Sequence, residues 1–119
     1  MKKIYRLKSN LQYKQTYKKG SVVTNKTLTL IFVKNNSLQQ KTIKDTAKFG
    51  FNISGKYGKA VKRNKLRRQL KTICSQVAEQ IQAGTYIFRP RFYANEAPEF
   101  CVLKNSALEL LEKTKQIFN

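Results

Sequence analysis

Residues 47–71 read AKFGFNISGKYGKAVKRNKLRRQLK, and the spacing of their apolar residues changes halfway along. Phe49, Phe51 and Ile53 alternate with polar or small residues, which predicts a strand over 47–53 with one buried face. After Gly58, apolar residues recur at helical spacing as far as Ile81, which predicts a long amphipathic helix over 59–82. This strand, turn and helix form the centre of the predicted fold.

Further elements flank this unit on both sides. Ser9 and Gln12 have the form of a capping box and Gly20 is a stop signal, so a first helix is predicted over 10–19. Strands are predicted over 27–34 and 85–89, the second ended by Pro90, while residues 41–44 are ambiguous and 92–97 are expected to form a loop.

The last helix has two possible starts, and the whole chain fits one domain. The helix begins either at Pro98 and Glu99 or at Ser106, and the earlier start is preferred. A length of 119 residues suits one compact domain over 1–119. The predicted fold is α+β in the order α-β-β(-β)-α-β-α, with helices packed on one mostly antiparallel sheet.

Positive charge is concentrated in one part of the chain. The 25 Lys and Arg residues outnumber the 6 Asp and Glu residues, and residues 1–72 contain 20 of the former but only Asp45 of the latter. Residues 73–119 contain five of each. A general lysine bias would enrich the whole chain alike, so the asymmetry indicates a surface for a polyanion.

The helix over 59–82 begins with cations where its macrodipole is already positive. Lys59, Lys62 and Arg63 therefore disfavour the free helix and favour an anionic partner, and lysines, arginines and Asn64 suit phosphate oxygens. A membrane surface fits less well, because the apolar face is needed as core and the chain has no Trp. Nucleic acid is the expected partner.

The chain lacks the residues from which a catalytic or metal site is usually built. It has no His, and only one acidic residue precedes position 79. Cys74 and Cys101 form neither a zinc site nor a disulfide framework, so both are expected to be buried thiols in a reducing cytoplasm. No signal peptide or membrane span is apparent.

The first predicted helix has an aromatic pair. Tyr13 and Tyr17 are four residues apart and so lie on one helix face. Both core packing and a surface role are open for them.

Residues 48–54 (KFGFNIS), Lys56, Gly58 and residues 60–68 (AVKRNKLRR) resemble the signature of the protein subunit of bacterial ribonuclease P. The similarity spans nearly the whole chain, although Lys65 replaces the second Arg of Arg-Asn-Arg and Gly55 stands where the family usually has a lysine. The resemblance implies a left-handed strand-helix-strand crossover around the basic helix, against the general rule.

The resemblance also implies a function: a ribonucleoprotein of the cytoplasm that removes 5′ leaders from precursor tRNA. The RNA subunit and its Mg²⁺ would do the chemistry, with one protein per RNA, no cofactor on the protein alone and no catalytic residue in it. The resemblance assigns contacts with the catalytic RNA to a cationic set of residues, namely Lys56, Lys59, Lys62, Arg63, Asn64, Lys65, Arg67, Arg68 and Lys71. It assigns leader binding, in a cleft between the sheet and the first helix, to Tyr13, Tyr17, Lys48, Phe51 and Arg89.

Two other functions are alternatives for this chain. Another small RNA-binding protein, such as a ribosomal protein, is the main alternative, and residues 55–58 match the GXXG loop of KH domains, although a strand-like segment precedes them. An autonomous nuclease is disfavoured because acid, base and metal ligands are missing.

Overall fold

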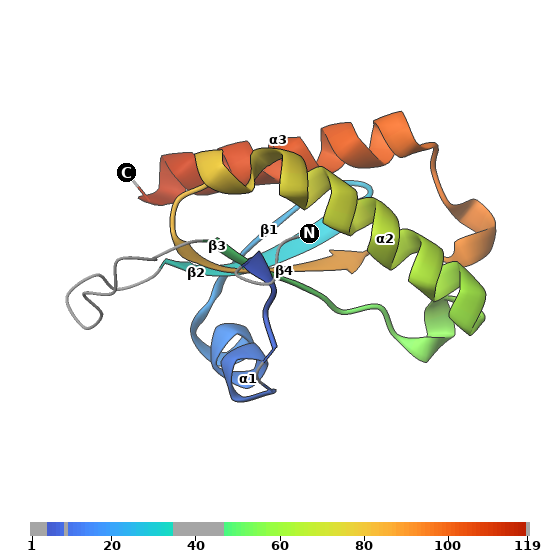
Figure 1. Ribbon diagram of the computed structural model, residues 1–119, viewed down its shortest axis with the longest axis horizontal. Coiled ribbons are helices and arrows are strands. Elements are labelled where there is room, and N and C mark those ends of the chain that lie inside the picture. The colour runs from blue at the N-terminus through green and yellow to red at the C-terminus, as the bar shows by residue number, and fades with distance from the viewer. Residues whose placement is uncertain (1–4, 9, 35–46, 119) are drawn as a thin grey trace.

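The computed structural model describes residues 5–8, 10–34 and 47–118, which form one α+β unit of three long helices and a four-stranded sheet (Figure 1). The elements follow one another as α1 (Asn10–Lys19), β1 (Ser21–Thr24), β2 (Leu28–Lys34), β3 (Ala47–Phe51), η2 (Gly55–Tyr57), α2 (Ala60–Val77), η3 (Ala78–Gln80), β4 (Gly84–Pro90), η4 (Ala94–Glu96) and α3 (Phe100–Phe118). The predicted fold class is confirmed.

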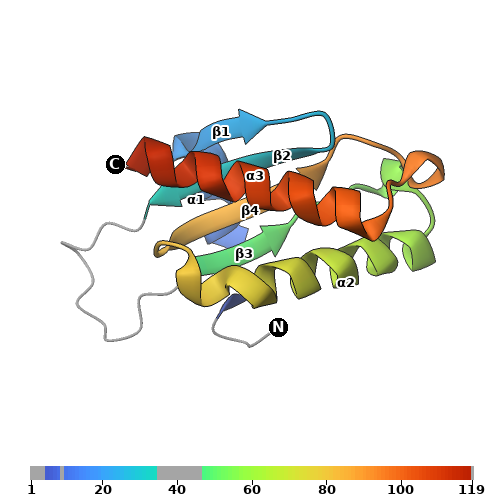
Figure 2. The same cartoon turned by 90° about the horizontal axis from the view of Figure 1, so that it is seen from above.

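The sheet is mixed, with the strand order β1-β2-β4-β3. β2 pairs antiparallel with both β1 and β4, whereas β3 pairs parallel with β4, so that Phe49 lies opposite Tyr86 and Gly50 opposite Ile87. α2 connects the two parallel strands by passing over the sheet, and Figure 2 shows that this crossover is left-handed. The topology implied by the family resemblance is therefore present.

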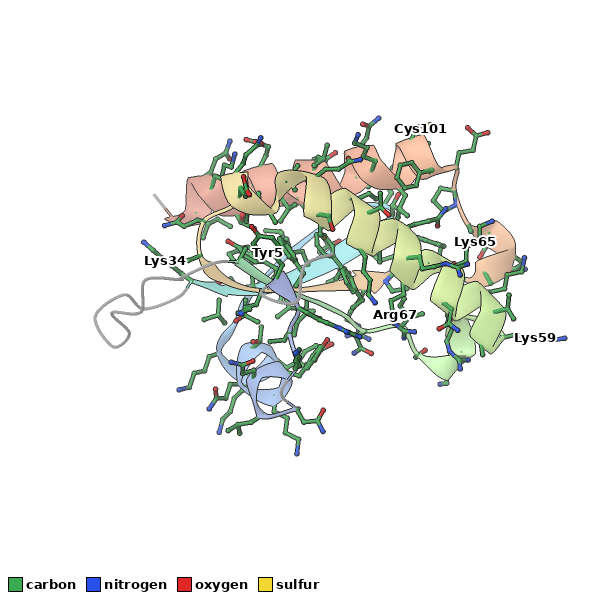
Figure 3. All side chains as sticks on the ribbon, in the orientation of Figure 1. Tyr5, Lys34, Lys59, Lys65, Arg67 and Cys101 are labelled. Atoms are coloured by element: carbon green, nitrogen blue, oxygen red, sulfur yellow. The ribbon has the colours of Figure 1, made fainter. Side chains whose placement is uncertain are left out.

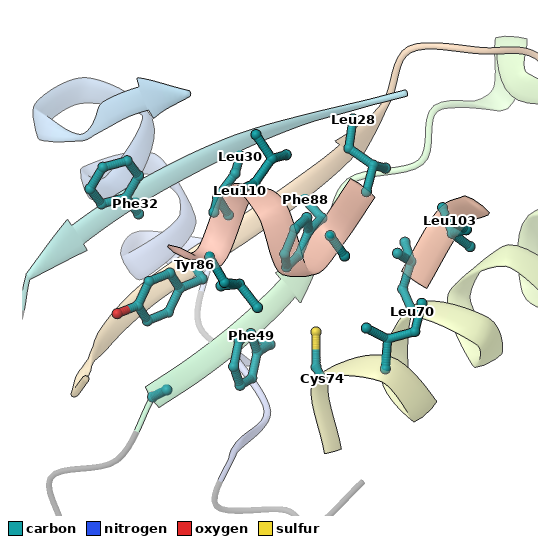
Figure 4. Close-up of a cluster of buried hydrophobic side chains, with 14 of the residues drawn as sticks. Leu28, Leu30, Phe32, Phe49, Leu70, Cys74, Tyr86, Phe88, Leu103 and Leu110 are labelled. Atoms are coloured by element: carbon teal, nitrogen blue, oxygen red, sulfur yellow. The ribbon is translucent and has the colours of Figure 1, made fainter. Parts of the chain in front are cut away.

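The main core lies between the sheet and the layer formed by α2 and α3 (Figure 4). Alternate strand residues face these helices, which is why Phe49, Tyr86 and Phe88 are buried there together. The helices contribute the apolar stripes that the sequence indicates, among them Leu66, Leu70, Ile73, Leu103 and Leu110. α2 is thereby held on the sheet by one face and leaves its other sides toward solvent.

α1 packs on the opposite face of the sheet (Figure 1). It buries Thr16 there, and an alanine methyl at Gly50 would overlap the phenol of Tyr13. The prediction that the strand over 47–53 has only one buried face was therefore wrong, because α1 covers the second face at Gly50. A Gly at this position lets the Tyr13 ring lie close to the strand backbone.

Several predicted boundaries changed in the structure. Residues 21–24 form a strand, β1, which the sequence analysis missed, and the ambiguous segment 41–44 lies outside the described residues. The long helix ends at Val77 and continues as a 3₁₀ turn, while the predicted loop 92–97 contains the 3₁₀ turn η4. The preferred earlier start of the last helix is confirmed, because α3 begins at Phe100.

The two cysteines differ in their surroundings. Cys74 of α2 is fully buried in the main core, and burial raises the pKa of its thiol well above the usual range. Cys101 is exposed in the first turn of α3, so the prediction that both thiols are buried was wrong for this residue. Its position on α3 turns it away from the core stripe that begins at Leu103.

Candidate nucleic-acid interface

α2 carries an excess of cations over acidic residues. Its first turn contains no acidic residue, and Lys59, at the N-cap, makes no side-chain capping bond. Within the described ranges the ion pairs are Glu109–Lys113 and Glu112–Lys115, both inside α3. The basic helix therefore keeps its charge available for a partner.

The predicted RNA-contacting residues do not form one face. Lys62 and Lys65 lie beside a small pocket next to η4, whereas Arg67 and Lys71 line a groove on the side of β3. Figure 3 shows Lys65 and Arg67 on different sides of α2, with Lys59 extending from its start. Arg68 lies between these sides and borders an open depression with Lys71, Thr72, Ser75 and Gln76.

Two members of the predicted set are held by the protein itself. Arg63 is half-buried and donates a hydrogen bond of 2.7 Å to the carbonyl oxygen of Gly58, so it holds the turn that leads into α2. Asn64 accepts a hydrogen bond of 3.0 Å from Arg67, which orients that guanidinium. Lys56 and Lys59 are exposed on the same turn and at the start of the helix.

A groove of about 150 Å³ lies at the outer edge of β3, and its lining includes residues from both faces of the sheet. Three cations from two parts of the chain meet there with an aromatic side chain of α1, the full lining being Arg6, Leu7, Tyr13, Phe49, Phe51, Arg67 and Lys71. Burial, together with the nearby Arg6 and Arg67, lowers the pKa of Lys71. The like charges favour an anion in this groove.

Tyr13 and Tyr17 differ in exposure although they share one helix face. Tyr13 is half-buried over Gly50; burial raises the pKa of its phenol, and a hydrogen bond that the phenol oxygen accepts from the backbone of Phe51 opposes that rise. Tyr17 is 39% exposed, and its hydroxyl accepts a hydrogen bond from the Asn52 amide. The ring of Tyr17 is thus accessible to solvent, and the hydrogen bond with Asn52 fixes its orientation.

The other predicted leader-binding residues lie around this helix. Lys48 points to the α1 face of the sheet opposite Thr85, and exposed Arg89 lies on the same face opposite Thr29. Phe51 belongs to the other face by alternation and stacks on Phe88, with ring centroids 6.4 Å apart. Of the predicted leader-binding residues, Phe51 lies near Tyr13 because both line the groove at the edge of β3.

Sequence reasoning missed several residues that the structure adds to these surfaces. Arg6 was not among the predicted site residues, although it bridges to Phe49 along the edge of β3 and lines the groove. Asn52 and Gln69 were missed as well. No pattern marks such residues in the sequence, because their roles depend on contacts between segments far apart in the chain.

The described residues include neither a cluster of metal ligands nor a helix suited to a membrane. In the described part of the chain, no three or more His, Cys, Asp or Glu side chains gather where they could hold a metal ion. None of the described helices has the length and apolar character needed to cross a bilayer.

Comparison with known proteins identifies the family. The family model described as Ribonuclease P matches residues 1–115. A protein of Thermoanaerobacter sp. (strain X514), named Ribonuclease P protein component, is 32% identical over 95% of this chain and 91% of its own length.

Solved structures agree with this match. The Staphylococcus aureus RNase P protein is 30% identical and superposes with a TM-score of 0.77, covering 97% of this chain and 98% of that one. The RNase P protein from Thermotoga maritima is 25% identical, with a TM-score of 0.77 and coverage of 91% and 96%. On its sequence, its topology and these matches, the chain belongs to the ribonuclease P family and is a ribonuclease P protein component.

Proposed function

We propose that this protein binds the catalytic RNA of ribonuclease P through α2 and the 5′ leader of precursor tRNA through the groove and sheet surface beside α1. A protein component of ribonuclease P works with the ribonuclease P RNA in tRNA processing, and that much follows from the family. The division of contacts between two surfaces is our proposal.

The observation that supports the proposal best is the arrangement of charge on α2. Its cations lie on three sides of one helix, and the ion pairs seen between described residues, Glu109–Lys113 and Glu112–Lys115, do not involve α2. Because each neutralised phosphate releases counterions, such a helix gains affinity for RNA without needing a particular base sequence. This suits a structured RNA partner that touches the helix on more than one side.

The surface beside α1 suits a single strand. Tyr17 presents an accessible ring, Tyr13 lies at the groove, and Lys48 and Arg89 add positive charge on the same face of the sheet. Aromatic stacking tolerates any base, which an enzyme acting on many different leaders needs. Backbone-tracking cations next to such a ring complete a binding surface for single-stranded RNA.

The proposed division of labour leaves the chemistry to the RNA subunit and its Mg²⁺. The described residues do not gather a metal site. In this proposal the protein raises affinity for the substrate and lowers the Mg²⁺ concentration that the RNA requires, because its cations take over part of the charge neutralisation.

Reconstitution tests the proposal directly. The purified protein alone is expected to cleave no precursor tRNA, whereas its addition to a bacterial ribonuclease P RNA is expected to increase 5′ leader removal strongly at low Mg²⁺. Cleavage rates measured over a range of Mg²⁺ concentrations, with and without protein, provide the test. RNA-free turnover that survives repurification, or no stimulation of the RNA, would refute the proposal.

A double substitution tests the α2 surface. The variant Arg67→Ala/Arg68→Ala is expected to bind the catalytic RNA about tenfold more weakly and to reduce the slope of log affinity against log salt by about one unit for each phosphate that is no longer neutralised. Binding titrations at several salt concentrations measure both quantities. A matched double variant on α3, Lys113→Ala/Lys115→Ala, removes two charges that are ion-paired within the helix and should leave the slope unchanged.

A further inference from the structure

A small pocket next to the start of α2 has a composition unlike the rest of the basic surface. It has a volume of about 170 Å³ and lies between η2, α2 and the segment before α3, lined by Tyr57, Lys62, Lys65, Leu66, Gln69, Ala94, Ala97 and Pro98. A cavity of this order accommodates one six-membered aromatic ring. Because the lining contains both apolar and polar side chains, it offers apolar atoms and hydrogen-bonding groups to a ligand of that size.

Tyr57 is the least expected member of this lining. Its side chain is only 6% exposed, and its ring packs edge-on against Phe92 with centroids 5.7 Å apart. Its hydroxyl makes no hydrogen bond to any residue that the structure describes, although buried tyrosine hydroxyls usually find a partner. The hydroxyl is therefore available to a ligand that accepts or donates a hydrogen bond.

The unpaired hydroxyl of Tyr57 remains reachable from solvent. Within the described part of the chain, no side-chain oxygen or nitrogen is both fully shielded and without a partner. The hydroxyl is therefore not fully shielded, and Tyr57 borders the pocket. Burial raises the pKa of Tyr57, so the group is a neutral phenol that donates a proton to an acceptor.

Charged and amide groups complete the pocket. Lys62 and Lys65 approach it from one flank of α2, and Gln69 lies one helical turn further along the same flank. The two ammonium groups suit a phosphate, whereas an amide and a phenol suit the hydrogen-bonding edge of a base. The floor formed by Leu66 and the Tyr57 ring is apolar and buried, which suits the face of a base.

We propose that this pocket binds one unstacked nucleotide of the RNA partner, with Lys62 and Lys65 at its phosphate and the Tyr57 hydroxyl and Gln69 amide at the edge of its base. The inference rests on the proposed function, because it requires that α2 contacts RNA. It goes further by giving α2 a base-reading site beside its phosphate contacts. Single-stranded nucleotides of a folded RNA have such exposed edges.

Two variants remove the base-reading groups without changing charge. Tyr57→Phe keeps the ring and its contact with Phe92, and Gln69→Leu keeps the size of the side chain. Each is expected to weaken binding to a bacterial ribonuclease P RNA about three- to tenfold, the effect of one hydrogen bond, while the salt slope stays at the wild-type value. The matched control is Tyr93→Phe, which removes a hydroxyl from a tyrosine that is 58% exposed and outside the pocket lining.

Chemical probing of the RNA makes the test specific. In the wild-type complex one unpaired nucleotide is expected to be protected from base-reactive reagents, and that same nucleotide should regain reactivity with Tyr57→Phe but not with Tyr93→Phe. Unchanged affinity of both pocket variants, or an unchanged protection pattern, would overturn the inference. These outcomes differ from failure of the proposed function, in which the wild-type protein itself would neither bind nor stimulate the RNA.

Discussion

Replacing Tyr17 by alanine is expected to weaken binding of precursor tRNA to the reconstituted holoenzyme by about 1–3 kcal/mol, the range for removing one stacked base. This corresponds to roughly 5- to 150-fold in the dissociation constant. The ring of Tyr17 is 39% exposed on α1, while its hydroxyl is tied to Asn52. A side chain so placed has a free aromatic surface and little conformational freedom to lose on binding.

The comparison of two RNAs and two variants isolates the stacking contribution. Mature tRNA has no leader, so its affinity for the holoenzyme should change little in Tyr17→Ala. Tyr17→Phe retains the ring and removes only the hydrogen bond with Asn52, so most of the leader affinity should remain. Affinities for both tRNAs are measured with each variant, together with the melting temperature of the free protein.

A different pattern would show that Tyr17 is structural. In that pattern, Tyr17→Ala lowers the melting temperature by many degrees and weakens the binding of precursor and mature tRNA equally. The ring would then contribute to the fold and not to leader binding. The exposure of Tyr17 and the burial of Thr16, its neighbour on α1, lead us to expect the first pattern.

Replacing Leu70 by alanine is expected to lower the free energy of unfolding by about 2–5 kcal/mol, as for other fully buried leucines. Leu70 is fully buried at the contact between α2, α3 and the sheet, as Figure 4 shows. A domain of this size is stable by only about 5–15 kcal/mol, so the decrease is a large part of the total. Chemical denaturation measures it, with Gln76→Ala on the exposed side of α2 as the control.

The Leu70 variant also calibrates the RNA-binding experiments. Under conditions where it remains folded, its salt slope for RNA binding should equal that of the wild type, because no charge is removed. An Arg67→Ala/Arg68→Ala protein that was destabilised as much as Leu70→Ala would indicate that these arginines support the fold. A decrease below about 1 kcal/mol for Leu70→Ala would contradict the position of α2 on the sheet.

The elements with the strongest local patterns were predictable from the sequence. The stripe from Leu66 through Ile73 follows from helical periodicity. The strand predicted over 47–53 from alternation is present as β3, although it ends at Phe51. Both patterns depend on neighbours within one element. The short strand β1 was not predictable, because Ser21–Thr24 has only four residues and is stabilised by its pairing with β2. The topology was inferred from resemblance to a family and not from local pattern.

The candidate site also has some features that follow from the sequence and others that depend on tertiary packing. The sequence alone determined that a cationic helix follows a β-strand, that acidic residues are nearly absent before position 79, and that two tyrosines share a helix face, because composition and spacing are properties of the chain itself. Tertiary packing places Arg63 on the carbonyl oxygen of Gly58 and Arg67 in a groove that Arg6 also lines. It also places Tyr57 beside Lys62 and Lys65. The physical reason is that burial and hydrogen-bond partners arise when distant segments pack together, and no local pattern specifies which side chain then meets which.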